Sequence, residues 1–131
     1  MKDRPKCEPA LKVSMTPQEL NIHETVFGGA IVSYIDLAGA VQCRREGCRR
    51  AVTITMDRVI FKEPVFKGDV VSFYTETKRL GNTSITVRVE VWAERFEPPF
   101  DSVWVTEAEV TYVNVDESRK PKPIPRSGGP S

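Results

Sequence analysis

Histidine is almost absent from this chain, which has one histidine and three cysteines in 131 residues. Hydrolases of the serine–histidine–acid type need a histidine base, and His23 alone supports no such triad. Cys7, Cys43 and Cys48 match neither a Cys-x-x-Cys pattern nor a zinc-ligand spacing. We therefore expect no bound metal and three reduced thiols, which favour a cytoplasmic protein.

The chain also lacks an excess of charge of either sign and any long hydrophobic run. Its 19 lysines and arginines nearly balance 18 aspartates and glutamates, so the formal net charge is +1. Such a surface has no uniform field for gripping nucleic acid, and we expect no nucleic-acid partner. No apolar segment approaches the ~20 residues of a membrane span, and the first residues are not followed by a signal-peptide core. We expect no membrane partner and a cytoplasmic location.

The length suits one folded domain, and its two ends differ in composition from the middle. Residues 1–10 carry three lysines or arginines and two prolines, and residues 116–131 are rich in proline, lysine and arginine. We predict a mobile N-terminal arm at residues 1–10, a folded domain at 11–115 and a mobile tail at 116–131.

Hydrophobic periodicity predicts one helix and five strands within the domain. Residues 25–46 show a period of 3.6, and Gly47 follows as a suitable helix stop. Alternation with a period of two indicates strands at residues 11–15, 51–63, 69–78, 85–94 and 102–115. Several long strands and a single helix predict an α+β fold, in which a curved antiparallel sheet wraps around one long central helix.

Asp36 is the most informative residue of the predicted helix. The apolar stripe contains Ile31, Ile35 and Ala38, and Asp36 projects from the opposite side. That side otherwise holds Gly29, Val32, Ser33, Gly39, Ala40 and Cys43. Asp36 is the only charged residue between residues 25 and 43. We therefore expect both sides of the helix to be covered, one by the sheet and the other by a partner subunit.

A buried carboxylate costs several kcal/mol unless it is hydrogen-bonded, so it usually has a function. The alternative is a structural aspartate that a helix cap or a neighbouring subunit's backbone satisfies. Aspartate is a poor residue for the middle of a helix and has no cap to make there. We interpret Asp36 as the centre of an active site.

The predicted helix start supplies a second candidate group. Gly28 and Gly29 let a ligand approach the free N–H groups of the first turn, which can stabilise an oxyanion. Close packing of two helix ends would need the same glycines. In the preceding loop, Asn21 can orient a water or a carbonyl and His23 can act as an acid or base. Turn formation and surface solvation are the alternatives for these two residues.

One carboxylate and one oxyanion site suffice for a thioester, because a thiolate with a reference pKa of about 8.5 leaves without much help. We predict that Asp36 is a general base for water, or a nucleophile through an anhydride, while Gly28 or Gly29 polarises the carbonyl. Gly29 and Asp36 stand ~10 Å apart along one helix. We therefore predict a shared site, in which Asp36 faces Asn21 and the glycines of a two-fold partner.

A series of short motifs extends over roughly residues 11–115. It comprises Asn21-x-x-x-x-Val26-Phe27-Gly28-Gly29, Ile35-Asp36-Leu37-Ala38-Gly39, Asp57, Phe61, Pro64-Val65, Gly68-Asp69, Gly81-x-Thr83-Ser84 and Val89-Glu90-Val91-Trp92. In this order they resemble the YciA-type acyl-coenzyme A (acyl-CoA) thioesterases, which are related to the brain-type acyl-CoA hydrolases.

The resemblance implies a hotdog fold, a homodimer assembled further into a hexamer or tetramer, and hydrolysis of acyl-CoA with no cofactor. It carries a catalytic aspartate onto Asp36, an assisting asparagine onto Asn21 and a carbonyl-binding helix start onto Gly28-Gly29. CoA would lie across subunit interfaces. The loop departs from the family at His23 and at Glu24, where glycine is usual.

Substrate contacts are expected at Phe27, Lys62, Arg79, Gly81, Thr83 and Ser84. For the CoA phosphates we favour Lys62, beside Pro64-Val65, and Arg79, beside the Gly81-x-Thr83-Ser84 turn.

Two other functions are alternatives to acyl-CoA hydrolysis. A non-catalytic acyl-thioester-binding module would have little use for a buried charge at Asp36. A hotdog dehydratase or hydratase would need a histidine and a carboxylate facing the acyl chain, and His23 lies in the wrong segment.

Overall fold

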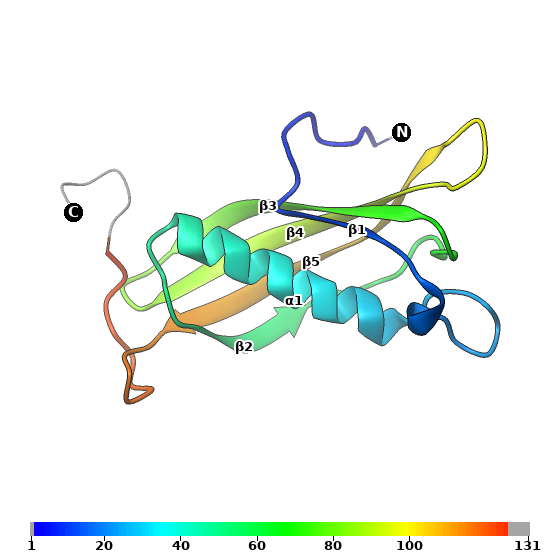
Figure 1. The fold of residues 1–131 in the computed structure, drawn as a ribbon. Coiled ribbons are helices and arrows are strands. Elements are labelled where there is room, and N and C mark those ends of the chain that lie inside the picture. The colour runs from blue at the N-terminus through cyan, green and yellow to red at the C-terminus, as the bar shows by residue number, and fades with distance from the viewer. Residues whose placement is uncertain (1, 126–131) are drawn as a thin grey trace.

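The computed structural model describes residues 2–125. A five-stranded antiparallel sheet curls around one long helix, α1 (Gly28–Arg45), as Figure 1 shows. The strands are β1 (Leu11–Ser14), β2 (Ala51–Asp57), β3 (Val70–Leu80), β4 (Ser84–Glu94) and β5 (Ser102–Asn114), and a short 3-10 helix, η1 (Pro17–Glu19), precedes α1. The predicted fold class is confirmed.

The core fills the space between α1 and the concave face of the sheet. The strand order is β1-β3-β4-β5-β2, which places β4 at the centre and β1 and β2 at the edges. Successive strand residues point to opposite faces, so alternate residues of β4 meet the helix. These residues are Ile85, Val87, Val89, Val91 and Ala93, each with 0% exposure. The predicted alternation in this strand is confirmed.

Helix α1 begins at Gly28 rather than at residue 25. The preceding residues are extended, since Thr25 forms a bridge with Phe66 and Phe27 has φ −71° and ψ 147°. Gly47 follows the helix with a φ of 96°, a left-handed conformation that favours glycine, so the predicted stop is confirmed.

The sheet covers more of α1 than one apolar stripe. Gly39 and Cys43 were predicted on the side that a partner subunit covers, but the chain's own curled sheet buries them, because it also contacts this flank of the helix. Ser33 and Leu37 remain exposed, and Leu37 is 56% exposed. The uncharged outer side of α1 is therefore open in a single chain.

Strand β2 is shorter than predicted. It ends at Asp57, because Arg58 has a φ of 62° that breaks the extended conformation. The following loop returns to the sheet where the Lys62 N–H donates to the Val105 carbonyl over 2.8 Å.

A β-bulge interrupts β2. Thr53 is paired with Tyr112 and Thr55 with Thr111, which leaves Ile54 as the extra residue. Regular alternation from Thr55 would place Ile54 opposite Tyr112. Because of the bulge, Thr53 faces α1 instead.

Parts of both predicted mobile ends pack on the domain. The Lys2 ammonium lies 3.4 Å from the Glu90 carboxylate. Ile124 is 5% exposed, and its N–H donates to the Asn82 carbonyl over 2.8 Å. Residue 1 and residues 126–131, which belong to the predicted arm and tail, lie outside the described residues, so their mobility stays a prediction.

Candidate functional site

The Asp36 carboxylate lies where α1 passes the edge strand β2. The Thr53 hydroxyl donates a hydrogen bond of 2.6 Å to Asp36 Oδ1. Asp36 is half-buried in the single chain. Among the described residues Thr53 is the one side-chain donor to this carboxylate, which leaves Oδ2 available to a water or an acyl group.

Thr53 was not among the predicted site residues. A threonine in an alternating strand is ordinary, and alternation by itself assigned Val52 and Ile54 to one face. The bulge that turns Thr53 towards Asp36 depends on pairing with β5, so only its identity as a hydroxyl donor was visible in the sequence.

A second hydroxyl reaches the backbone of the same helical residue. Tyr112 on β5 donates to the Asp36 carbonyl oxygen over 2.7 Å. Tyr112 is 1% exposed, and burial is the main reason that its hydroxyl pKa is raised, so the group stays protonated. Gly39 makes room for this approach, because a Cβ at residue 39 would overlap the tyrosine oxygen.

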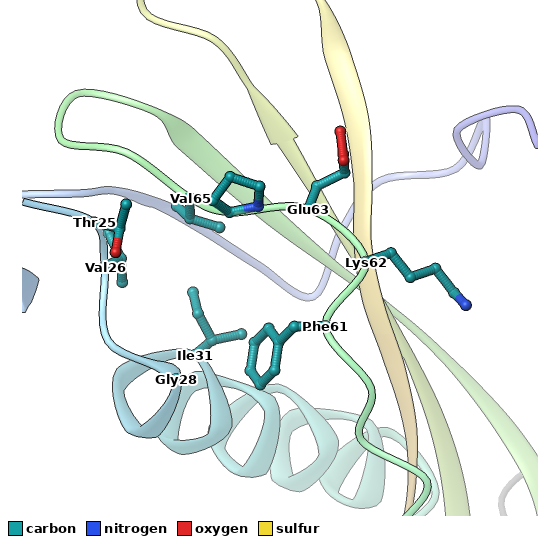
Figure 2. A pocket seen from close by; sticks show the side chains of 9 residues that line it. Thr25, Val26, Gly28, Ile31, Phe61, Lys62, Glu63 and Val65 are labelled. Atoms are coloured by element: carbon teal, nitrogen blue, oxygen red, sulfur yellow. The ribbon is translucent and has the colours of Figure 1, made fainter. Parts of the chain in front are cut away.

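A cavity of about 290 Å³ opens beside the start of α1. Its lining comprises Thr25, Val26, Gly28, Ile31, Phe61, Lys62, Glu63, Pro64 and Val65. Figure 2 shows the Phe61 ring beside Ile31 and the first turn of α1, while the Lys62 side chain points away from them. A Cβ at Gly28 would lie 3.3 Å from the Phe61 ring. The glycine thus keeps the space between ring and helix start open.

The first turn of α1 borders this space, and Gly28 belongs to its lining. Phe27 occupies the N-cap position and makes no side-chain capping hydrogen bond, and the first turn contains no acidic residue. Uncapped N–H groups at a helix start carry a partial positive charge and bind anionic oxygen atoms. The Gly28-Gly29 segment is therefore suited to polarise a carbonyl.

Asn21 organises the loop that leads into α1. Its Oδ1 accepts the N–H groups of His23 at 2.8 Å and Thr25 at 3.2 Å, and its Nδ2 donates to the Thr25 hydroxyl at 3.0 Å. Glu24 has a φ of 63° within this turn, a conformation that favours the glycine usual in the resembling family. His23 is exposed. Turn formation is thus observed for Asn21, and assistance in catalysis stays a prediction.

Asp36 and the cavity at the helix start are separate within one chain. The cavity is lined by Gly28 but not by Asp36, and Asp36 stands eight positions after Gly28, which is ~12 Å along the helix. A base and a carbonyl-binding group must both lie within about 3 Å of the reacting group. Asp36 and Gly28 cannot act together on one carbonyl within a single chain.

The predicted CoA-binding residues are also dispersed. The turn at residues 81–84 lies at the opposite end of the sheet from the start of α1, as Figure 1 shows. The Lys62 ammonium lies 4.7 Å from the centre of the Trp104 ring. Arg79 is exposed on β3, and Phe27 is 43% exposed. One chain does not gather these residues around one ligand.

The outer edge of β2 is a candidate contact surface. Within residues 2–125, β2 pairs only with β5. Val52 and Ile54 are 44% and 56% exposed on this strand, and Leu37 is 56% exposed on α1. A strand edge with exposed apolar side chains is suited to pairing with another chain.

The described residues include neither a metal-binding cluster nor a membrane-spanning helix. Residues 2–125 contain no group of three or more His, Cys, Asp or Glu side chains that could hold a metal ion. No helix in the same range is long and apolar enough to cross a membrane.

Cys43 and Cys48 are both buried, and burial is the main cause that raises the pKa of Cys43 to about 12.

The comparisons with known proteins agree on one family. The thioesterase superfamily matches residues 23–96. The acyl-CoA thioester hydrolase YciA of Salmonella typhimurium is 35% identical over 130 residues, with 98% of each chain covered. A hexameric hotdog fold thioesterase of Campylobacter jejuni has a TM-score of 0.87 at 47% identity, over 93% of each chain. A hexameric broad specificity acyl-coenzyme A thioesterase has a TM-score of 0.88 at 32% identity, over 95% of this chain and 86% of that one. With its hotdog sheet around a helix that carries one central aspartate, the chain belongs to the thioesterase superfamily, among the YciA-type acyl-CoA thioester hydrolases.

Proposed function

We propose that this protein hydrolyses acyl-CoA thioesters to a carboxylic acid and CoA, with Asp36 as the catalytic carboxylate. The observation that carries the proposal is the 2.6 Å hydrogen bond from Thr53, which orients a lone carboxylate on an otherwise uncharged stretch of helix. Relatives that match nearly the whole chain are named acyl-CoA thioester hydrolases, which supports the same substrate class.

In this mechanism the Asp36 oxygen Oδ2 removes a proton from water, or attacks the acyl carbon to form an anhydride that water then opens. The N–H groups of Gly28 or Gly29 hold the carbonyl oxygen as negative charge develops on it. CoA leaves as a thiolate, which needs no strong acid beside it. The reaction uses no cofactor beyond the CoA of the substrate.

The complete site forms between two subunits. Asp36 lies beside the exposed edge of β2 through its bond to Thr53, so a second chain that pairs with this edge brings its own residues close to Asp36. The half-site at Gly28 needs a carboxylate that its own chain does not supply, and Asp36 needs a carbonyl-binding group. A two-fold dimer satisfies both requirements, with the Asn21 loop facing the partner's Asp36. The hexameric relatives support a further assembly of three such dimers.

The CoA phosphates are bound by basic residues, for which Lys62 and Arg79 are the candidates. Both side chains are exposed, and Arg79 is the penultimate residue of β3, just before the turn at residues 81–84. Their separation within one chain supports CoA binding across subunits. The three unpaired cysteines support a location in the cytoplasm.

The test is hydrolysis of a series of acyl-CoA substrates of increasing chain length, followed by release of the free thiol. We expect turnover by the wild type and a fall in kcat of at least about a hundredfold for Asp36→Asn, the scale of a lost general base. Circular dichroism and CoA binding should be unchanged. Asp101→Asn, at an exposed aspartate in the β4–β5 loop, is the matched control and should keep full activity.

A non-catalytic binding module would bind acyl-CoA in the wild type without releasing thiol. Wild-type turnover by a folded Asp36→Asn variant would contradict the assignment of the carboxylate.

A further inference from the structure

We propose that Tyr112 is a positioning residue for the Asp36 carboxylate and acts through the backbone of α1. Tyr112 does not line the cavity and its hydroxyl is buried, so it does not touch the substrate. Its hydroxyl donates to the carbonyl oxygen of Asp36 itself, at 2.7 Å. The inference rests on the proposed function, since it explains how the catalytic carboxylate is held in place.

Two neighbouring strands deliver two hydroxyls to the same helical residue. Thr53 and Tyr112 are directly paired across β2 and β5. Thr53 donates to the Asp36 side chain at 2.6 Å, and Tyr112 donates to the Asp36 main chain at 2.7 Å. The sheet therefore holds both ends of this residue from one cross-strand pair. A change in the height of the helix above the sheet would alter both bonds together.

Gly39 is the second element of the arrangement. A Cβ at this position would overlap the Tyr112 oxygen and lie 2.9 Å from two of its ring carbons. Glycine within a helix is less favourable than alanine by about 1 kcal/mol. Its presence here is explained by the close approach of the tyrosine, which no other residue would allow.

The hydrogen bond is not required by the helix itself. A helical carbonyl already accepts the N–H of the residue four positions later, and its second lone pair is normally left to water. Tyr112 takes this second lone pair in a position that is buried. The bond fixes the turn of α1 that carries Asp36 against β5, next to the strand that carries Thr53.

Tyr112→Phe removes the hydroxyl and keeps the ring, and it is tested in two backgrounds. In the wild type we expect kcat for acyl-CoA hydrolysis to fall about tenfold or more, because a displacement of ~1 Å in catalytic geometry costs up to about a hundredfold. The KM should change less than about twofold, since substrate contacts remain. In an Asp36→Asn background the same substitution should change the residual rate less than about twofold, because no carboxylate remains to be positioned.

Two further variants separate positioning from stability. Tyr74→Phe removes the hydroxyl of another buried tyrosine, on β3, and should leave kcat unchanged. Gly39→Ala displaces the Tyr112 hydroxyl by a different route and should reproduce the selective loss of kcat. Melting temperatures establish that each variant is folded at the assay temperature.

A folded Tyr112→Phe variant with wild-type kcat would overturn the positioning role. If Asp36→Asn still shows its large loss of kcat, the proposed function stays intact. An equal fold loss from Tyr112→Phe in both backgrounds would also overturn it, because a purely structural role has that signature. Full activity of Asp36→Asn would instead reject the catalytic assignment on which both proposals depend.

Discussion

The Thr53 hydroxyl lies 2.6 Å from the Asp36 carboxylate and joins the middle of α1 to the edge strand of the sheet. The proposed base is thus oriented by the strand that also offers the exposed edge for a second subunit. This hydrogen bond links subunit assembly to catalysis, because a shift of β2 on dimer formation would also move the Asp36 carboxylate.

Removal of the Thr53 hydroxyl should impair catalysis without unfolding the protein. Thr53→Val keeps the shape of the side chain and should lower kcat about tenfold, while Thr53→Ser keeps the donor and should stay within about threefold of the wild type. Steady-state kinetics and a melting curve of each variant measure the effect. Equal kcat values for the valine and serine variants would show that the hydroxyl has no part in the reaction.

Mixing two inactive variants should restore activity if the site is shared. Asp36→Ala and Asn21→Ala, or Gly29→Val if Asn21→Ala retains activity, are refolded together at equal concentration. Random pairing makes about half of the dimers mixed, and each mixed dimer has one intact site, so about a quarter of the wild-type activity should return. Each variant refolded alone is the control. No recovery, with subunit exchange confirmed by mass spectrometry, would reject the shared site and leave the role of Asp36 standing.

The affinity for acyl-CoA should fall as the salt concentration rises, because salt screens the attraction between basic residues and the CoA phosphates. Screening of exposed charges changes strongly between salt concentrations of about 0.05 M and about 0.5 M. An increase over this range should raise the KM for acyl-CoA several-fold. The matching thioester of N-acetylcysteamine lacks the phosphates and should show little change. The same salt response for both thioesters would mean that Lys62, Arg79 and other basic residues do not bind the phosphates.

The thiols should react in an order set by burial. Cys7 is exposed, whereas Cys43 and Cys48 are buried and both have raised pKa values. With a pKa of about 12, the fraction of Cys43 present as thiolate at pH 8 is about one in ten thousand. Iodoacetamide should therefore add one group per folded chain, at Cys7, and three in urea. Cys7→Ser should abolish labelling of the folded chain, and rapid labelling of Cys43 would contradict its buried position.

The sequence was sufficient to predict the architecture, because the helical and strand periods of its hydrophobic residues are each visible within a single element. The 3.6-residue period of α1 and the alternation in β4 each depend on one element, and both were found close to their observed places. The start of α1 was placed too early, because Val26 and Phe27 are apolar and continue the pattern although the chain is still extended there.

Only part of the candidate site could be predicted from the sequence, because some of its contacts join residues that are far apart along the chain. Asp36 could be identified because a lone charge in an apolar stretch is itself a local signal. Thr53 and Tyr112 could not, because their relation to Asp36 depends on strand register and on a bulge at Ile54. The 3.6-residue period also gave no sign of the contact of Gly39 with Tyr112, because a helical wheel does not include the strands around the helix.

The packing of Ile124 has a consequence for where the chain can be shortened. Pro121 pairs with Val115 just after the end of β5, and the Asn114 side chain donates to the Lys122 and Pro123 carbonyls at 3.1 and 3.3 Å. Cutting the chain after residue 115 would follow the boundary suggested by composition, yet it would remove the buried Ile124 and leave the Asn114 amide without these acceptors. A shortened chain that keeps this end of the core closed therefore has to include Ile124. If a protease cuts the chain near residue 117, the hydrogen bonds of Lys122, Pro123 and Ile124 should keep the C-terminal fragment bound to the domain.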